Sequence, residues 1–133
     1  MTDSRYRMLL WTYVALVLAA IVASAFPPHT EALESALEAE PTTWLWSNIG
    51  VSIGLFSVLA LAWLVGLVGL FRFKSWGRSI SLYATVAGLL ATVLAGSSLY
   101  WGLESGLYEA SAMLWGAILA LSYFSSVSAR FGR

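Results

Sequence analysis

The sequence has no cysteine among its 133 residues, and it has a single histidine. Without cysteine the chain has no disulfide, no thiolate metal ligand and no thiol nucleophile. Charged residues are also scarce, at 11% of the chain, whereas hydrophobic residues make up 59%. A water-soluble domain cannot bury so large an apolar fraction, so the composition indicates an integral membrane protein.

Long tracts without charge separate the few charged positions. A transmembrane helix needs about 20 mostly apolar residues to cross about 30 Å of hydrocarbon, and several tracts reach that length. We therefore expect an all-α fold, a membrane-spanning four-helix bundle that forms a single domain over residues 1–133. The expected spans are residues 8–26, 44–71, 79–103 and 110–129.

Basic and acidic residues alternate between the segments that flank these spans. The basic residues lie before the first span, between the second and third, and after the fourth: Arg5, Arg7, Arg72, Lys74, Arg78, Arg130 and Arg133. Six of the seven acidic residues lie in the two other loops: Glu31, Glu34, Glu38, Glu40, Glu104 and Glu109. Because short loops rich in Lys and Arg stay in the cytoplasm, we expect a multi-pass protein of the bacterial inner (plasma) membrane with both termini cytoplasmic.

The first span also has features of a secretory signal, because Arg5 and Arg7 precede an apolar run that ends in Ala23-Ser24-Ala25. The run is longer than the apolar region of most signals and contains Trp11. We therefore expect this span to be retained; cleavage after Ala25 is the alternative, and it would leave the other three spans in the same orientation.

The segment after the first span has a different pattern. Between Thr30 and Glu40, Leu33 and Leu37 recur at helical spacing among glutamates, and Pro41 follows. This pattern predicts a short extracytoplasmic amphipathic helix; the alternative is a flexible acidic loop.

Small residues recur at every fourth position in each predicted span, and such rows let helices approach closely in lipid. The rows are Ala15, Ala19 and Ala23; Gly50 and Gly54; Ala84, Gly88, Thr92 and Gly96; Ala112, Gly116 and Ala120. We expect these rows to pack inside the bundle. The alternative is that at least one row faces a membrane-protein partner or a second copy of the chain.

Aromatic and basic residues alternate between the second and third spans, in the stretch LFRFKSWGR over residues 70–78. Cations there meet anionic headgroups, and the rings settle at the membrane interface. The candidate residues for contact with a lipid headgroup or a cytosolic partner are Arg72, Lys74, Trp76 and Arg78. The stretch resembles a hinge of uncharacterised small bacterial four-helix inner-membrane proteins, in which Phe, Lys, Trp and Arg occur in this order before a further span. The resemblance covers this stretch alone.

A second set of polar residues is expected on the outer face: His29, Asn48, Ser52, Glu104 and Glu109. Their nitrogen and oxygen atoms suit a small polar site or a divalent cation. Their spacing matches no metal motif, so we expect an ordinary solvated rim with neither a metal nor a cofactor.

No ionisable side chain lies in the body of a predicted span, and this absence argues against proton-coupled transport. No His-Glu pair on a helix supports a catalytic centre, so we do not expect an enzyme. The expected partners are the lipid bilayer and a membrane protein or a second copy, not nucleic acid. The favoured function is an accessory or interaction protein (a complex subunit, an assembly factor or a toxin-immunity protein) acting through helix contacts. A passive channel or transport element is the alternative, and a membrane enzyme comes third.

Overall fold

The computed structural model describes residues 2–26, 35–36, 38–39, 41–96, 98 and 100–132. Within these residues the elements are α1 (Asp3–Ser24), α3 (Trp44–Ser47), α4 (Ile49–Phe71), α5 (Ser75–Ala95), α6 (Gly102–Phe124) and the 3-10 helix η1 (Ser126–Gly132). The described part contains no strand, which confirms the predicted all-helical fold. Four helices, α1, α4, α5 and α6, are long and apolar enough to cross a membrane, as expected of a multi-pass membrane protein.

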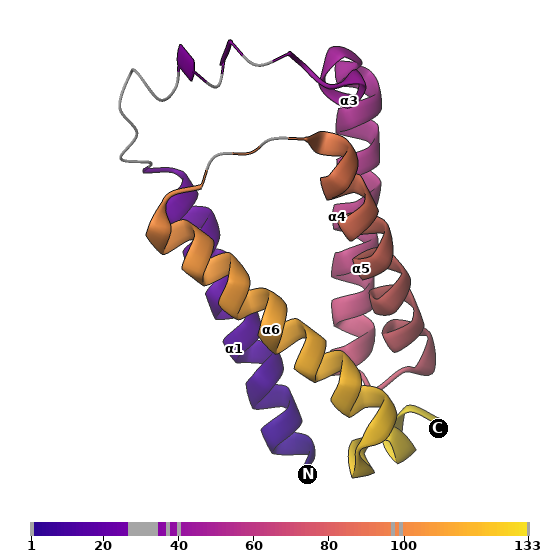
Figure 1. Cartoon of the computed structure of the whole chain (residues 1–133). Helices are drawn as coiled ribbons and strands as arrows, with labels where there is room; N and C mark the ends of the chain where they lie inside the picture. Colours follow the sequence, from indigo (N-terminus) through magenta and orange to yellow (C-terminus); the bar gives the residue numbers. More distant parts are fainter. Residues whose placement is uncertain are drawn as a thin grey trace.

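The four long helices form two antiparallel pairs. Helix α1 packs along α6, and α4 packs along α5 (Figure 1). The pairs meet at the end that holds both chain termini and the α4–α5 turn, and they diverge toward the opposite end (Figure 1). We call the first the basic end and the second the acidic end, because of the residues described below.

Three aromatic rings join the two pairs at the basic end. Tyr6 of α1 lies 5.7 Å from Phe73 of the α4–α5 turn and 6.0 Å from Phe131 of η1, and Phe73 lies 5.4 Å from Phe131 between ring centroids. Tyr6, Leu10 and Leu70 are fully buried beside them. Phe73 has a φ of 52°, a left-handed conformation that is unfavourable for a bulky residue; its ring contacts offset that cost.

Basic side chains surround this ring cluster. The guanidinium of Arg7 lies 5.4 Å from the centre of the Phe73 ring, and that of Arg78 lies 4.8 Å from the Tyr123 ring. Arg130 forms an ion pair with Asp3 at 3.0 Å. The basic residues named here come from separate segments of the sequence, and they lie together at the basic end.

The helix bounds differ from the expected spans at several places, and three of these differences change the arrangement of the molecule. Helix α5 ends at Ala95 instead of Leu103, because Gly96 adopts a φ of 82°, which glycine accepts and which ends a helix. Helix α6 ends at Phe124 instead of residue 129. The chain then turns back through η1, so that Val127 and Phe131 enter the core, each about 1% exposed.

The third difference concerns the acidic residues of the last loop. Helix α6 begins at Gly102, so Glu104 and Glu109 lie in its first turns and not in a connecting loop. Carboxylates are favourable near the positive N-terminal end of a helix. Glu104 is only 6% exposed.

Tryptophan side chains cap the helices that end at the acidic end. The indole N–H of Trp46 and the hydroxyl of Thr43 donate to the carbonyl of Ala95 at the end of α5, at 3.0 and 3.2 Å. The indole of Trp101 donates to the carbonyl of Ala23 in the last turn of α1, at 3.3 Å. Each of these bonds lies within one helix pair.

The predicted amphipathic helix over Thr30 to Glu40 lies mostly outside the described residues, as does His29. Of this segment the structure describes Ser35, Ala36, Glu38 and Ala39. The N–H of Ala39 donates to the carbonyl of Ser35 at 3.2 Å, a bond of the α-helical type.

Glycines make the closest helix contact, which lies between α4 and α5. A Cβ atom added to Gly69 would lie 2.7 Å from Cζ3 of Trp76 and would also meet the backbone of Gly77. A Cβ atom added to Gly66 would lie 2.5 Å from the hydroxyl oxygen of Ser81. The two backbones therefore touch beside the short turn, as small residues permit.

The rows of small residues predicted from the sequence do not make this contact. Around Gly50, Gly54, Gly88 and Gly116, an added Cβ atom would have no atom of the described chain within 4 Å. Ala15, Ala19, Ala112 and Ala120 are exposed, and Ala84 is half-buried. Gly96 does not pack inside a span either, because it follows the end of α5. The expectation that these rows pack inside the bundle was therefore wrong for most of their members: the helices separate into two pairs, which leaves the rows uncovered.

We predict that Gly69→Ala destabilises the protein and that Gly88→Ala does not. An added methyl group at Gly69 meets backbone atoms of α5, and overpacking of this kind costs about 1–3 kcal/mol. Gly88 has space for the same methyl group, and alanine favours the helix. The midpoint of thermal unfolding in detergent should fall for Gly69→Ala and stay the same or rise for Gly88→Ala. Equal midpoints would contradict the backbone contact.

Candidate functional site

Four side chains, one from each long helix, form a network midway between the two ends of the molecule. The indole N–H of Trp63 in α4 donates to the hydroxyl of Tyr13 in α1 at 2.8 Å. The indole N–H of Trp115 in α6 donates to the hydroxyl of Thr85 in α5 at 2.7 Å. The rings of Tyr13 and Trp115 stack, with centroids 4.6 Å apart. We call these four residues the aromatic network.

The aromatic network connects the two helix pairs through two partly buried hydrogen bonds. A buried indole N–H needs a hydrogen-bond acceptor, because its desolvation is costly when it has none. Each bond of the network crosses from one pair to the other: Trp63 of the α4–α5 pair binds α1, and Trp115 of the α1–α6 pair binds α5. The hydroxyl of Thr85 donates in turn to the carbonyl of Ser81 at 2.7 Å.

A cleft lies between the diverging pairs, with the aromatic network as its floor. Its volume is about 620 Å³, which is within the range of small-molecule sites. The lining residues are Tyr13, Trp63, Thr85, Thr92, Tyr100, Ser105, Tyr108, Glu109, Ser111, Ala112 and Trp115. The lining thus combines aromatic faces with hydroxyl groups and one carboxylate.

The charge of the lining is negative. Among the described residues that line the cleft, Glu109 is the one charged residue, and none is a lysine or an arginine. Tyr100 and Tyr108 lie on the same lining, with ring centroids 5.6 Å apart in an edge-to-face arrangement. The cleft is therefore an aromatic site with a carboxylate at its side.

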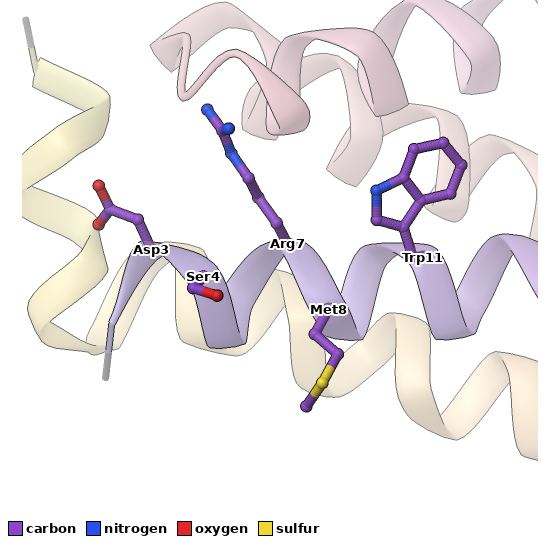
Figure 2. Close-up of a pocket in the computed structure, with 5 residues that line it drawn as sticks. All are labelled: Asp3, Ser4, Arg7, Met8 and Trp11. Atoms are coloured by element: carbon purple, nitrogen blue, oxygen red, sulfur yellow. The ribbon is translucent and has the colours of Figure 1, made fainter.

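A second hollow, of about 590 Å³, lies along the first turns of α1 at the basic end. Its lining residues are Asp3, Ser4, Arg7, Met8 and Trp11. Figure 2 shows the side chains of Arg7 and Trp11 extending from the same side of α1, and that of Met8 from the opposite side. Trp11 contacts Phe71, with ring centroids 5.2 Å apart. A cation beside an indole in this position suits the headgroup level of a membrane.

The structure divides the predicted hinge residues into two groups. Arg72, Lys74 and Trp76 are exposed and remain available for a headgroup or a partner. Arg78 is half-buried; its guanidinium lies over the rings of Tyr123 and Phe131 and donates to the carbonyl of Ser122 at 3.3 Å. Arg78 therefore holds α5 against α6 and η1.

The predicted outer polar site is not formed by the described residues. Asn48 and Ser52 lie where α3 meets α4, whereas Glu104 and Glu109 lie on α6 in the other helix pair, and the pairs are separate at this end (Figure 1). The side-chain amide of Asn48 donates to the carbonyl of Trp44 at 2.9 Å. Among the residues that the structure describes, no group of three His, Cys, Asp or Glu side chains could hold a metal ion. His29 lies outside these residues.

Ser52 stands in the sequence Gly50-Val51-Ser52-Ile53-Gly54, which has the letters of a hydrolase nucleophile motif. That motif requires a sharp turn between a strand and a helix, which exposes the hydroxyl. Here the serine lies inside helix α4, is about 2% exposed and donates its hydroxyl to the carbonyl of Leu45. Ser52 therefore joins α3 to α4 and is not placed as a nucleophile.

The aromatic network was not predicted from the sequence. Part of the signal was present, because Trp63 lies well inside the predicted span 44–71, whereas tryptophan is enriched at the membrane interface. Trp115 is the sixth residue of the predicted span 110–129, so the predicted bounds put it near the interface. A tryptophan far from the interface needs an acceptor for its N–H within the protein. Sequence alone does not show that Tyr13 and Thr85 supply those acceptors.

Comparisons with protein-family models, with curated proteins and with solved structures find no match to this chain.

We predict that Thr85→Val destabilises the protein and that Thr92→Val is nearly neutral. The first variant leaves the indole N–H of Trp115 without its acceptor, whereas Thr92 donates only to the carbonyl of Gly88 in its own helix. Hydrogen bonds between membrane helices contribute about 0.6–2 kcal/mol. Thermal unfolding in detergent should show a lower midpoint for Thr85→Val alone, together with a change in tryptophan fluorescence. If both variants behave alike, the network does not stabilise the fold.

Proposed function

We propose that this chain is an accessory protein of the bacterial inner membrane that binds another integral membrane protein through its exposed rows of small residues. The observation that supports the proposal is the open space around Gly50, Gly54 and Gly116, where an added Cβ atom would meet no described atom of the chain. A complex subunit, an assembly factor and a toxin-immunity protein all work through such contacts.

Close packing of helices drives their association in lipid. Apolar side chains gain little by leaving lipid for a protein surface, so helices associate where small residues allow close packing. The chain uses Gly66, Gly69 and Gly77 for its own closest contact. Most residues of its other small-residue rows are exposed, and large exposed side chains such as Met113, which is 75% exposed, lie beside them.

One row is suited to a partner helix. Ala112, Gly116 and Ala120 lie at four-residue spacing on α6, and all three are exposed. A partner helix could approach this face more closely than a face covered by leucine, and a second copy of the chain is the simplest form of such a partner.

We propose the orientation from the arrangement of charge. The exposed Arg72 and Lys74 share the basic end with both chain termini, and Glu104 and Glu109 lie in the first turns of α6 at the acidic end (Figure 1). By the positive-inside rule, the basic end faces the cytoplasm.

The orientation predicts the behaviour of topology reporters. A reporter that is active only in the cytoplasm should work when fused after Arg133 and should be silent when inserted between Glu31 and Glu40. A reporter that is active only outside the cytoplasm should give the reverse pattern, which serves as the control. Cytoplasmic activity from the inserted position would overturn the proposed orientation.

The binding surface predicts a difference between two neighbouring substitutions on α6. Gly116→Leu should lower recovery of the membrane partner on gentle detergent extraction, because the new side chain holds the partner helix away. Ala117→Leu introduces the same side chain at an exposed residue outside the row, so it should leave recovery unchanged.

Both variants should keep the thermal stability of the unaltered chain, because the space at Gly116 is open in the single chain. Quantitative mass spectrometry of the co-purifying proteins measures recovery, and native mass spectrometry shows whether the partner is a second copy. Equal recovery for the two variants would contradict the proposed binding surface.

A further inference from the structure

We propose that the cleft between the two helix pairs binds an organic cation with an apolar body. The cation is either a free amphiphilic ammonium or phosphonium compound or the ammonium headgroup of a lipid. This inference does not depend on the accessory role, because it rests on the charge and the aromatic rings of the cleft, although Thr92 and Ala112 belong both to its lining and to the rows of small residues.

The described lining of the cleft carries a negative charge. Glu109 lines it, and in the described part of the chain this carboxylate forms no ion pair. Glu104 adds a second carboxylate one helical turn before Tyr108, at the same end of α6. The described basic residues lie at the opposite end or in the turn beside it, so no described cation neutralises the cleft. Glu109 is exposed and Glu104 is buried, and opposite charges attract one another more strongly in surroundings of low polarity than in bulk water.

Five side-chain hydrogen-bond donors of the lining already donate within the protein. The indoles of Trp63 and Trp115 donate to Tyr13 and Thr85. The hydroxyls of three other lining residues donate to carbonyls of their own helices: Thr85 to Ser81, Thr92 to Gly88 and Ser111 to Tyr108. Both indole N–H groups of the described lining are therefore used within the protein. The other polar side chains of that lining are hydroxyls and the carboxylate of Glu109, whose oxygen atoms, together with the ring faces, favour a cation.

Aromatic rings make up much of the lining of the cleft. Tyr100 and Tyr108 form one ring pair on the lining, and Tyr13 and Trp115 form a stacked pair at the floor. Ring faces attract organic cations, by about 0.5–1 kcal/mol at exposed sites and about 2 kcal/mol where water is excluded. The same rings pack against the apolar part of the ligand.

The size of the cleft and the access to it also suit an organic cation with an apolar body. A volume of about 620 Å³ is large enough for a bulky organic cation and larger than an inorganic ion requires. The helix pairs diverge toward the acidic end (Figure 1). An amphiphile can therefore enter sideways from the bilayer without crossing the ring cluster at the basic end.

The test uses two probes of similar shape and opposite charge. The full chain is placed in phosphatidylcholine nanodiscs, and binding of tetraphenylphosphonium and of tetraphenylborate is measured by equilibrium dialysis, with empty nanodiscs as the blank. Saturable binding of the phosphonium cation, without matching binding of the borate anion, is the expected result. Absence of saturable binding, or equal binding of both ions, would overturn the proposal.

Two pairs of variants locate the site. Glu109→Gln should weaken binding of the cation about tenfold, which corresponds to about 1.4 kcal/mol, whereas Glu38→Gln removes an exposed carboxylate outside the cleft and should have no effect. Tyr100→Leu should weaken binding about threefold through loss of the ring, whereas Tyr100→Phe should keep it. Tyr100 is exposed and lies outside the helices, so its variants test the site even if a change at Glu109 impairs folding. Equal affinities within both pairs would place the cation elsewhere.

A third arm separates the two sources of the cation. Part of the phosphatidylcholine, whose headgroup carries an ammonium group, is replaced by an uncharged glycosyl diacylglycerol that has none, and the phosphonium titration is repeated. A shift of the titration to lower concentration identifies the ammonium headgroup of the lipid as a competing ligand of the cleft. An unchanged titration assigns the cleft to free organic cations.

Discussion

The contact of three rings at the basic end is the interaction on which the rest of the structure depends. Tyr6, Phe73 and Phe131 come from α1, from the α4–α5 turn and from η1, so these rings hold together parts of the chain that are far apart in sequence. The contact requires the left-handed backbone at Phe73 and the turn after α6 that brings η1 back to the core. Other contacts between the two helix pairs include the aromatic network, the ring contact of Trp11 with Phe71 and the contacts of Arg78 with α6 and η1.

The two pairs differ in how they are stabilised. Helices α4 and α5 touch through glycine backbones beside a short turn, whereas α1 and α6 are distant in sequence and bury large side chains such as Leu10 and Ile118. The aromatic network adds a few directional bonds between the pairs. The cleft exists because these bonds lie midway along the helices and the described residues above them do not close the gap.

The sequence predicts the coarse architecture well, since composition and uncharged length decide whether a helix can cross a membrane. It also places like charges in alternate segments, and the structure gathers the basic ones at one end. The ends of the helices were less predictable: Gly96 could continue a row of small residues or end a helix, and only its φ of 82° decides between the two. Four-residue spacing shows which face of a helix is small, but not which neighbour covers it. For that reason Gly88 and Gly116 were expected inside the bundle, while Gly69 and Gly77 make the contact. The aromatic network depends on pairs of residues distant in sequence, which a single sequence does not reveal.

The capping tryptophans have a mechanical consequence. Trp46 of α3, directly before α4, bonds to the end of α5, and Trp101, directly before α6, bonds to the last turn of α1. The two helices of each pair are therefore held together at the end where the pairs separate. A rigid pair can therefore rotate about the ring cluster as its pivot only as far as the bonds of the aromatic network, midway along the helices, allow. A helix of 22 residues such as α1 is about 33 Å long, so a rotation of about 5° at the pivot moves its far end by about 3 Å. A small repacking of one ring at the cytoplasmic side of the proposed orientation would thus appear at the opposite side as a displacement nearly the width of a methyl group, with no helix bending along the way.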